Sequence, residues 1–153
     1  MSKWTRWRPI DAPSGCLGAA AYQVRLKRRS RPVSLARLLG RDTSGVLAIG
    51  EAGNLEKRRK QFLRGLRTGA GHSEADLIWL LTLTGRAERL FTGTALEYRF
   101  RSAPNKQAAT DFEKKAFWSY VRRFGEVPPF NSSFPGRRAL IEGHRRKTSR
   151  GAS

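Results

Sequence analysis

The chain contains a single cysteine, Cys16, among its 153 residues. A lone cysteine excludes an intramolecular disulfide framework and a zinc site built from cysteines. Long apolar runs are also missing, since no stretch approaches the roughly 18 apolar residues that a membrane-spanning helix needs. The first residues lack the basic, apolar and small-residue pattern of a secretory signal. We therefore expect a cytoplasmic protein that makes no membrane contact.

Acidic residues are few in number. Asp and Glu total 12 against 31 Lys and Arg, which gives a formal net charge of +19 and a pI of about 11.6. A domain with this excess attracts polyanions, and each neutralised phosphate of a nucleic acid releases counterions. DNA is the expected partner, with RNA as the alternative. The composition identifies no protein partner.

The chain is long enough for one domain with a hydrophobic core. We expect residues 1–18 to be a lead-in packed on the domain. Its residues Trp4 and Trp7 have two interpretations, as packing residues or as a base-stacking platform. The domain itself is expected over 19–134, followed by a basic flexible tail over 135–153.

Three ranges carry the pattern of β-strands. Apolar and polar residues alternate from Tyr22 onward in 19–27 and over 95–101, and 45–49 is a short apolar run. The first two strands in the chain are predicted to form a hairpin with a long insertion. That insertion, 28–44, has two interpretations around Leu35–Leu39: a short strand or a helical turn.

Three helices are predicted from apolar residues at helical spacing. The first follows Asn54, the second covers 75–83 with Ser73 as its cap, and the third covers 107–124. The leucines and isoleucine of the second helix predict a core helix; they are Leu77, Ile78, Leu80 and Leu81. The order of elements predicts an α+β fold with a small three-stranded antiparallel sheet flanked by helices.

The stretch from Gly45 to Leu66 combines a strand, a turn and a basic helix. The apolar run is followed by a segment with two glycines, Gly50 and Gly53, and then by a helix whose first turns are cationic. Those cations are Lys57, Arg58, Arg59 and Lys60. A strand that ends in a tight turn before such a helix can present positive charge to a phosphate.

The polar residues around this stretch suit hydrolysis of a phosphodiester. Tyr22 lies on the first strand, Arg58 on the basic helix and Glu113 in the last helix, with Asn131 just after it. A metal ion held by a carboxylate polarises the phosphate, and an arginine stabilises the charge that develops on it. A phenol can orient the attacking water or take its proton.

These residues lie in segments that resemble the motifs of the GIY-YIG nuclease superfamily. Ala-Ile-Gly-Glu-Ala-Gly-Asn-Leu-Glu-Lys-Arg at 48–58 resembles the second motif and its helix, and Gly-His-Ser at 71–73 a histidine-bearing turn. Leu-Glu-Tyr-Arg-Phe at 96–100 resembles the third strand. Phe-Glu at 112–113 and Phe-Gly-Glu-Val-Pro-Pro-Phe-Asn at 124–131 resemble the closing helix and its asparagine.

The resemblance, which covers roughly 18–132, implies roles by position. Tyr22 matches the first-motif tyrosine, Arg58 the phosphate-facing arginine, and Glu113 the glutamate that holds one Mg²⁺ or Mn²⁺. His72 matches a histidine that only some members use. We include it among the predicted catalytic residues. Nucleic-acid contacts are expected from the remaining basic residues of the helix and from the closing asparagine: Lys57, Arg59, Lys60, Arg64 and Asn131.

Both signature motifs depart from the family pattern. The first reads Ala20-Ala21-Tyr22 and the second Ala48-Ile49-Gly50, so the second-motif tyrosine is replaced by Ala48. Glu51, His72 and Tyr98 are the three candidates to compensate for the missing hydroxyl. Two functions therefore stay open: a metal-dependent DNA endonuclease, or a catalytically impaired domain of this type that binds nucleic acid alone or within a larger nucleoprotein assembly.

Overall fold

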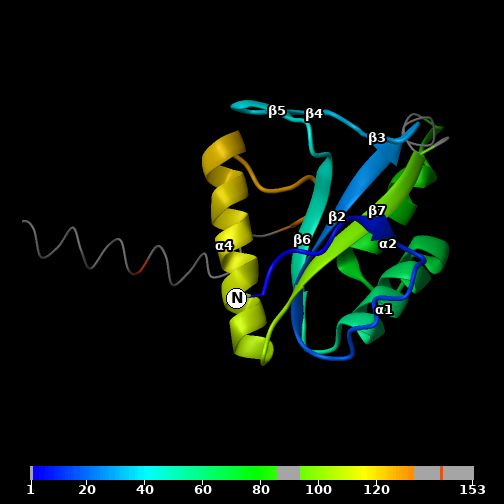
Figure 1. Cartoon of the computed structure of the whole chain (residues 1–153). Helices are drawn as coiled ribbons and strands as arrows, with labels where there is room; N and C mark the ends of the chain where they lie inside the picture. Colours follow the sequence, from blue (N-terminus) through cyan, green and yellow to red (C-terminus); the bar gives the residue numbers. More distant parts are fainter. Residues whose placement is uncertain (1, 86–93, 133–141, 143–153) are drawn as a thin grey trace, which may run out of the picture.

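The computed structural model describes residues 2–85, 94–132 and 142. It has three layers (Figure 1). Helix α4 (Lys106–Phe124) covers one face of an antiparallel sheet, and helices α1 (Leu55–Thr68) and α2 (Ser73–Thr82) cover the other. The predicted α+β fold class is confirmed. No helix in the described part of the chain has the length and hydropathy needed to cross a membrane.

Three long strands form the body of the sheet. Strand β2 (Ala20–Arg28) lies between β7 (Thr94–Ser102) and β6 (Val46–Ala52), and both neighbours run antiparallel to it. Two-residue strands add to this body, β1 (Arg8–Pro9) beside β7 and β3 (Arg31–Pro32) beside β2. The sheet therefore has five strands rather than the predicted three, because two-residue strands are too short to show any hydrophobic period.

The insertion between β2 and β6 is a chain of short strands. After β3, strands β4 (Leu35–Arg37) and β5 (Gly40–Asp42) form a separate two-stranded hairpin. This selects the short-strand interpretation of the connector. The hairpin contacts the end of α4, where the Leu39 N–H donates to the carbonyl of Phe124 at 3.1 Å.

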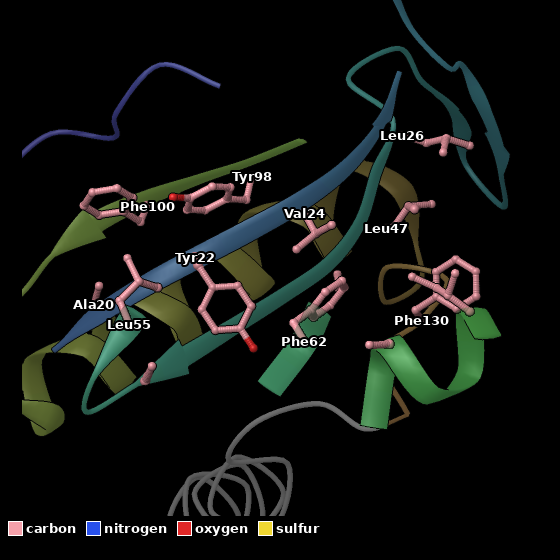
Figure 2. Packing of buried hydrophobic residues seen from close by; sticks show 14 residues of the cluster. Ala20, Tyr22, Val24, Leu26, Leu47, Leu55, Phe62, Tyr98, Phe100 and Phe130 are labelled. Atoms are coloured by element: carbon pink, nitrogen blue, oxygen red, sulfur yellow. The ribbon is translucent and has the colours of Figure 1, made fainter. Parts of the chain in front are cut away.

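Alternate residues of the strands build two cores. Tyr22, Val24 and Tyr98 point to the face covered by α1, where they meet Leu55 and Phe62 (Figure 2). The opposite face packs on α4 through a second cluster of buried residues: Val46, Ile49, Phe117, Tyr120 and Phe124. The predicted alternation is confirmed for the first core, where Tyr22 and Val24 share a face, whereas the second core was not predicted.

Strand β6 extends further than its apolar run. The strand continues through Gly50 and Glu51 to Ala52, which pairs with Ala20 of β2. The predicted turn is therefore shorter, and Glu51 sits on a strand instead of in a loop. Pairing with β2 extends the strand because it satisfies backbone groups that a turn would leave to water.

The ends of α1 have the expected capping groups. The Asn54 side chain accepts the Lys57 N–H at 2.9 Å, and Gly69 ends the helix in the left-handed region with φ of 68°. Glycine adopts this conformation without the steric cost that a side chain would impose.

Two predictions about α2 are wrong. Its N-cap is His72 and not Ser73, whose hydroxyl donates to Glu74 instead. The helix is not a core helix either, because Leu77 and Leu80 are 38% and 54% exposed. Ala75 and Ile78 are buried and Leu81 packs against the core, so one stripe of the helix meets the domain while Leu77 and Leu80 face outward.

The lead-in contacts the domain through backbone and side-chain groups. The Thr5 N–H donates to the Phe100 carbonyl at 2.8 Å, and the Tyr98 hydroxyl donates to the Ala12 carbonyl at 2.9 Å. The Ser14 hydroxyl and N–H both donate to Glu56 of α1. The expected tail, 135–153, lies outside the described residues apart from Glu142.

Gly50 is required by the packing of Tyr22. The two residues are paired across β2 and β6, and a Cβ at position 50 would lie 2.5 Å from both Cζ and Oη of Tyr22. We predict that Gly50→Ala lowers the free energy of unfolding by about 1–3 kcal/mol, because the ring must move in a filled core. Chemical denaturation measures this loss.

Gly53→Ala is the matched control. A Cβ at position 53 would meet only the flexible Lys106 side chain, at 3.9 Å. The free energy of unfolding of Gly53→Ala should therefore stay close to that of the original chain. Equal stability of the Gly50 and Gly53 variants would contradict the packing argument.

Candidate active site

Tyr22 and His72 form the buried centre of the site. Tyr22 projects from β2, and its hydroxyl lies 3.0 Å from Nε2 of His72, which is 4% exposed. The imidazole packs against Phe62 of α1, with ring centroids 4.9 Å apart. The histidine reaches this place because Gly71, at a φ of 137°, turns the chain just before α2. The contact joins the sheet to α2.

Glu74 lies behind the imidazole. Its Oε2 lies 2.7 Å from Nδ1 of His72, a contact that becomes an ion pair when the imidazole is protonated. Burial raises the pKa of Glu74, but His72, the Ser73 hydroxyl and a backbone N–H together outweigh burial and leave that pKa below its ordinary value. Phenol, imidazole and carboxylate thus follow one another in a line from β2 to α2.

Ionisable side chains from five elements, β2, β6, α1, α2 and α4, shift one another's pKa values here. Burial raises the pKa of the Tyr22 hydroxyl well above its ordinary range, the charge of Glu74 adds to this, and Arg58 opposes it. Burial also raises the pKa of Glu113 to about 7, with further contributions from Glu51 and Glu74. These mutual influences indicate that Tyr22, Arg58 and Glu113 lie in one region of the fold, with Glu51 of β6 and Glu74 of α2 beside them.

A cleft of about 150 Å³ opens beside this centre. Glu51 and Arg58 line it together with Lys57, Gln61 and Lys106. One oxygen of Glu51 lies 3.9 Å from the Lys106 ammonium, while the other is buried without a hydrogen-bond partner. A carboxylate beside an arginine in an open cleft can take part in binding a phosphate and a cation.

A larger groove of about 510 Å³ runs along α1. Three of the residues predicted to bind nucleic acid line it, Lys57, Lys60 and Arg64, and all three are exposed. They are three to four residues apart, so they lie on one face of the helix. The groove and the cleft share Lys57, which makes them one continuous basic surface.

Arg59 does not belong to that surface, and its predicted contact with nucleic acid is corrected here. The side chain is 7% exposed, and its guanidinium pairs with Glu56 at 2.6 Å. It also donates to the carbonyls of Ile10 and Asp11 at 2.9 and 3.0 Å. Arg59 holds the lead-in on α1 and has no exposed guanidinium to offer a phosphate.

Asn131 also has a different role from the one predicted. Its side chain accepts the Ile49 N–H and donates to the Ile49 carbonyl, both at 2.9 Å, and so caps the free edge of β6. Its Nδ2 lies 3.3 Å from Glu74. The amide is therefore occupied by protein groups, and the residue closes the site instead of binding nucleic acid.

At position 48, where the resemblance predicts a tyrosine, the chain has an alanine. Ala48 is 1% exposed in the core cluster and brings no polar group. Among the three candidate replacements, His72 touches the Tyr22 hydroxyl and Glu51 lines the cleft. Tyr98 does not take part, because its hydroxyl binds the Ala12 carbonyl of the lead-in.

Glu74 was not predicted as a site residue. A glutamate in the first turn of a helix is common, since it interacts favourably with the helix dipole. The only signal for Glu74 in the sequence was its position two residues after His72. That spacing does not show whether the carboxylate contacts the imidazole.

The carboxylates fit a single bound divalent cation. Glu51 and Glu74 disfavour ionisation of Glu113, and a cation would relieve that repulsion. Mg²⁺ in nuclease-type sites uses one or two carboxylates with substrate phosphates and waters. Within the described residues no group of three acidic, histidine or cysteine side chains is placed to enclose a metal, so the fit is to an open site.

No protein-family model, curated protein or solved structure matches this chain. The resemblance to GIY-YIG nucleases thus stays a prediction from the motifs. The fold class and the geometry of the site stand on the structure alone.

Glu113 should make stability depend on pH. Because its pKa is raised from 4.5 to about 7, the folded protein binds more protons than the unfolded chain between these values. The free energy of unfolding should therefore fall as pH rises through this window, by roughly 1–3 kcal/mol. Glu113→Gln should remove most of that fall. The groups facing Glu113 are Glu51, Glu74, Arg58 and Lys114.

Chemical denaturation at about pH 5 and about pH 8, without divalent cations, measures the effect. Asp111→Asn, which removes an exposed carboxylate from the same helix, should leave the pH dependence unchanged. Identical pH profiles for the original chain and Glu113→Gln would show that Glu113 titrates normally.

Proposed function

We propose that this protein is a metal-dependent endonuclease that hydrolyses phosphodiester bonds of DNA. The observation that carries the proposal is the line of Tyr22, His72 and Glu74. A buried phenol held on an imidazole, with a carboxylate behind it, is an arrangement that moves protons. Structural roles alone seldom require three such groups in sequence.

The chain supplies a path for the proton of an attacking water. With its proton on Nδ1, facing Glu74, His72 accepts the hydroxyl proton of Tyr22 at Nε2, and Tyr22 can then orient or deprotonate the water. Glu74 stabilises the positive imidazolium that forms. This use of His72 gives the site a polar partner for Tyr22 where Ala48 provides none.

Arg58 and Glu113 act on the phosphate side. The guanidinium of Arg58 would pair with the scissile phosphate and stabilise its developing negative charge. Glu113, with Glu51 beside it, would hold the cation. A bound Mg²⁺ or Mn²⁺ polarises the phosphate as a Lewis acid. The exposed cations of the α1 groove would bind the flanking phosphates.

A second candidate is a nucleic-acid-binding domain without cleavage. It is favoured by Ala48 and by the burial of Tyr22, which is 6% exposed and whose pKa is strongly raised. In that case the basic groove along α1 would bind the nucleic acid and the cleft would have no catalytic role. DNA is the first substrate to test and RNA the second.

The test incubates the purified chain with plasmid and with single-stranded DNA, with and without Mn²⁺. We predict metal-dependent cutting that Glu113→Ala abolishes. Loss of the proton acceptor in His72→Ala should lower the rate by about 10²–10⁴-fold. Arg58→Ala should lower the rate too, because the transition-state charge loses its partner.

The controls keep the same helices and change groups outside the cleft. Asp111→Asn on α4 and Arg67→Ala on α1 should cut at the original rate, and thermal unfolding confirms that each variant is folded. Salt-sensitive DNA binding without cutting in the presence of Mn²⁺ would overturn the nuclease and leave the binding domain.

A further inference from the structure

A second basic groove lies on the opposite face of the sheet from α1. It runs between α4 and the N-terminal segment, which lie side by side (Figure 1), and has a volume of about 320 Å³. Four cationic side chains line it: Arg99, Arg101, Lys115 and Arg123. Four aromatic residues line it as well: Trp4, Phe112, Tyr120 and Phe124. We refer to it as the N-terminal groove.

The arginines at the base of the groove lack negative partners. Arg25, on the same face, is paired with Glu97 at 2.6 Å. Within the part of the chain that the structure describes, Arg99 and Arg101 form no ion pair. The Nε of Arg99 donates a hydrogen bond to Oε1 of Gln23 at 2.8 Å, and the Nε of Arg101 is buried with no hydrogen-bond partner.

Aromatic rings hold these arginines in place. The Arg99 guanidinium lies 4.6 Å from the ring of Trp7 and 5.2 Å from that of Trp4. Arg101 lies 3.7 Å from the ring of Phe112 on α4. Burial, and then the charge of Arg25, lower the pKa of Arg99, which shows that its charge is poorly compensated.

Asp42 also lines the groove but does not neutralise it. Its two oxygens accept the N–H groups of Ser44 and Val46 and the hydroxyl of Tyr120, and the residue is 1% exposed. An anion from outside would therefore find cations whose charge is not already cancelled, and an unused N–H donor at Arg101.

We propose that the N-terminal groove binds a phosphate of a single-stranded nucleic acid, with a base against Trp4. Its volume suits one nucleotide rather than a duplex, since small-molecule sites begin at about 300 Å³. Cations beside an aromatic side chain are the combination by which single strands are bound. The groove and the candidate active site share α4 but use different side chains.

The test follows the indole N–H signals of the tryptophans by NMR, with Trp4→Phe to assign the signal of Trp4. The probes are inorganic phosphate, adenosine 5′-monophosphate and a short oligothymidylate. We expect the Trp4 signal to shift with the oligonucleotide, less with the mononucleotide and least with phosphate. A mononucleotide that binds as tightly as the oligonucleotide would assign the groove to free nucleotides and overturn the proposal.

Variants of the exposed rim avoid disturbing the fold. Lys115→Gln with Arg123→Gln should weaken oligothymidylate binding at Trp4 and lower its salt dependence by about one unit of log-log slope per lost contact. Lys57→Gln with Lys60→Gln, an equal charge change on α1, should leave the Trp4 shift intact. Arg99→Gln with Arg101→Gln should abolish it.

The outcomes for the two sites are distinguishable. The proposed binding in the N-terminal groove would be overturned by a Trp4 signal that shifts with none of the probes. It would also be overturned by equal shifts in the Lys115/Arg123 variant and the Lys57/Lys60 variant. Neither result depends on DNA cutting, which reports on Glu113 and His72. A chain that never cuts DNA can still show the Trp4 shift.

Discussion

The buried contact between the Tyr22 hydroxyl and His72 holds the candidate active site together. It joins β2 to the start of α2, and it depends on β6, because only glycine at position 50 leaves space for the ring. Phe62 of α1 and Glu74 of α2 then fix the imidazole from two sides. The docking of α2 and the chemistry of the site therefore rest on the same few atoms.

The distribution of charge follows from this arrangement. In a chain of net charge +19, two acidic residues, Glu51 and Glu74, lie close enough to a third, Glu113, to raise its pKa. Other carboxylates are paired with arginines in the usual way, as Glu97 is with Arg25. Like charges brought together at a cleft lower stability, and such clusters with shifted pKa values are common at functional sites.

Much of the fold was predictable because it is encoded locally. Alternation around Tyr22 and Tyr98 predicted the two central strands and their buried faces, and Asn54 marked the start of α1. The errors arose where tertiary packing decides. Leu80 belongs to an apolar helix but faces outward, and Arg59 belongs to a basic run but turns inward to the lead-in, since periodicity and charge do not tell which neighbours a face will meet.

The sequence alone determined the fold class, the basic surface of α1 and the types of residue in the candidate site, because hydrophobic period, charge and motif spacing are local properties. The tertiary structure decided which of those groups meet. It placed His72 on Tyr22, fifty positions away in the chain, and set Glu74 behind it. It also left the buried Nε of Arg101, in the part of the chain that the structure describes, without a hydrogen-bond partner beside an aromatic groove. Such contacts depend on how sheet and helices pack, and packing is a property of the whole chain.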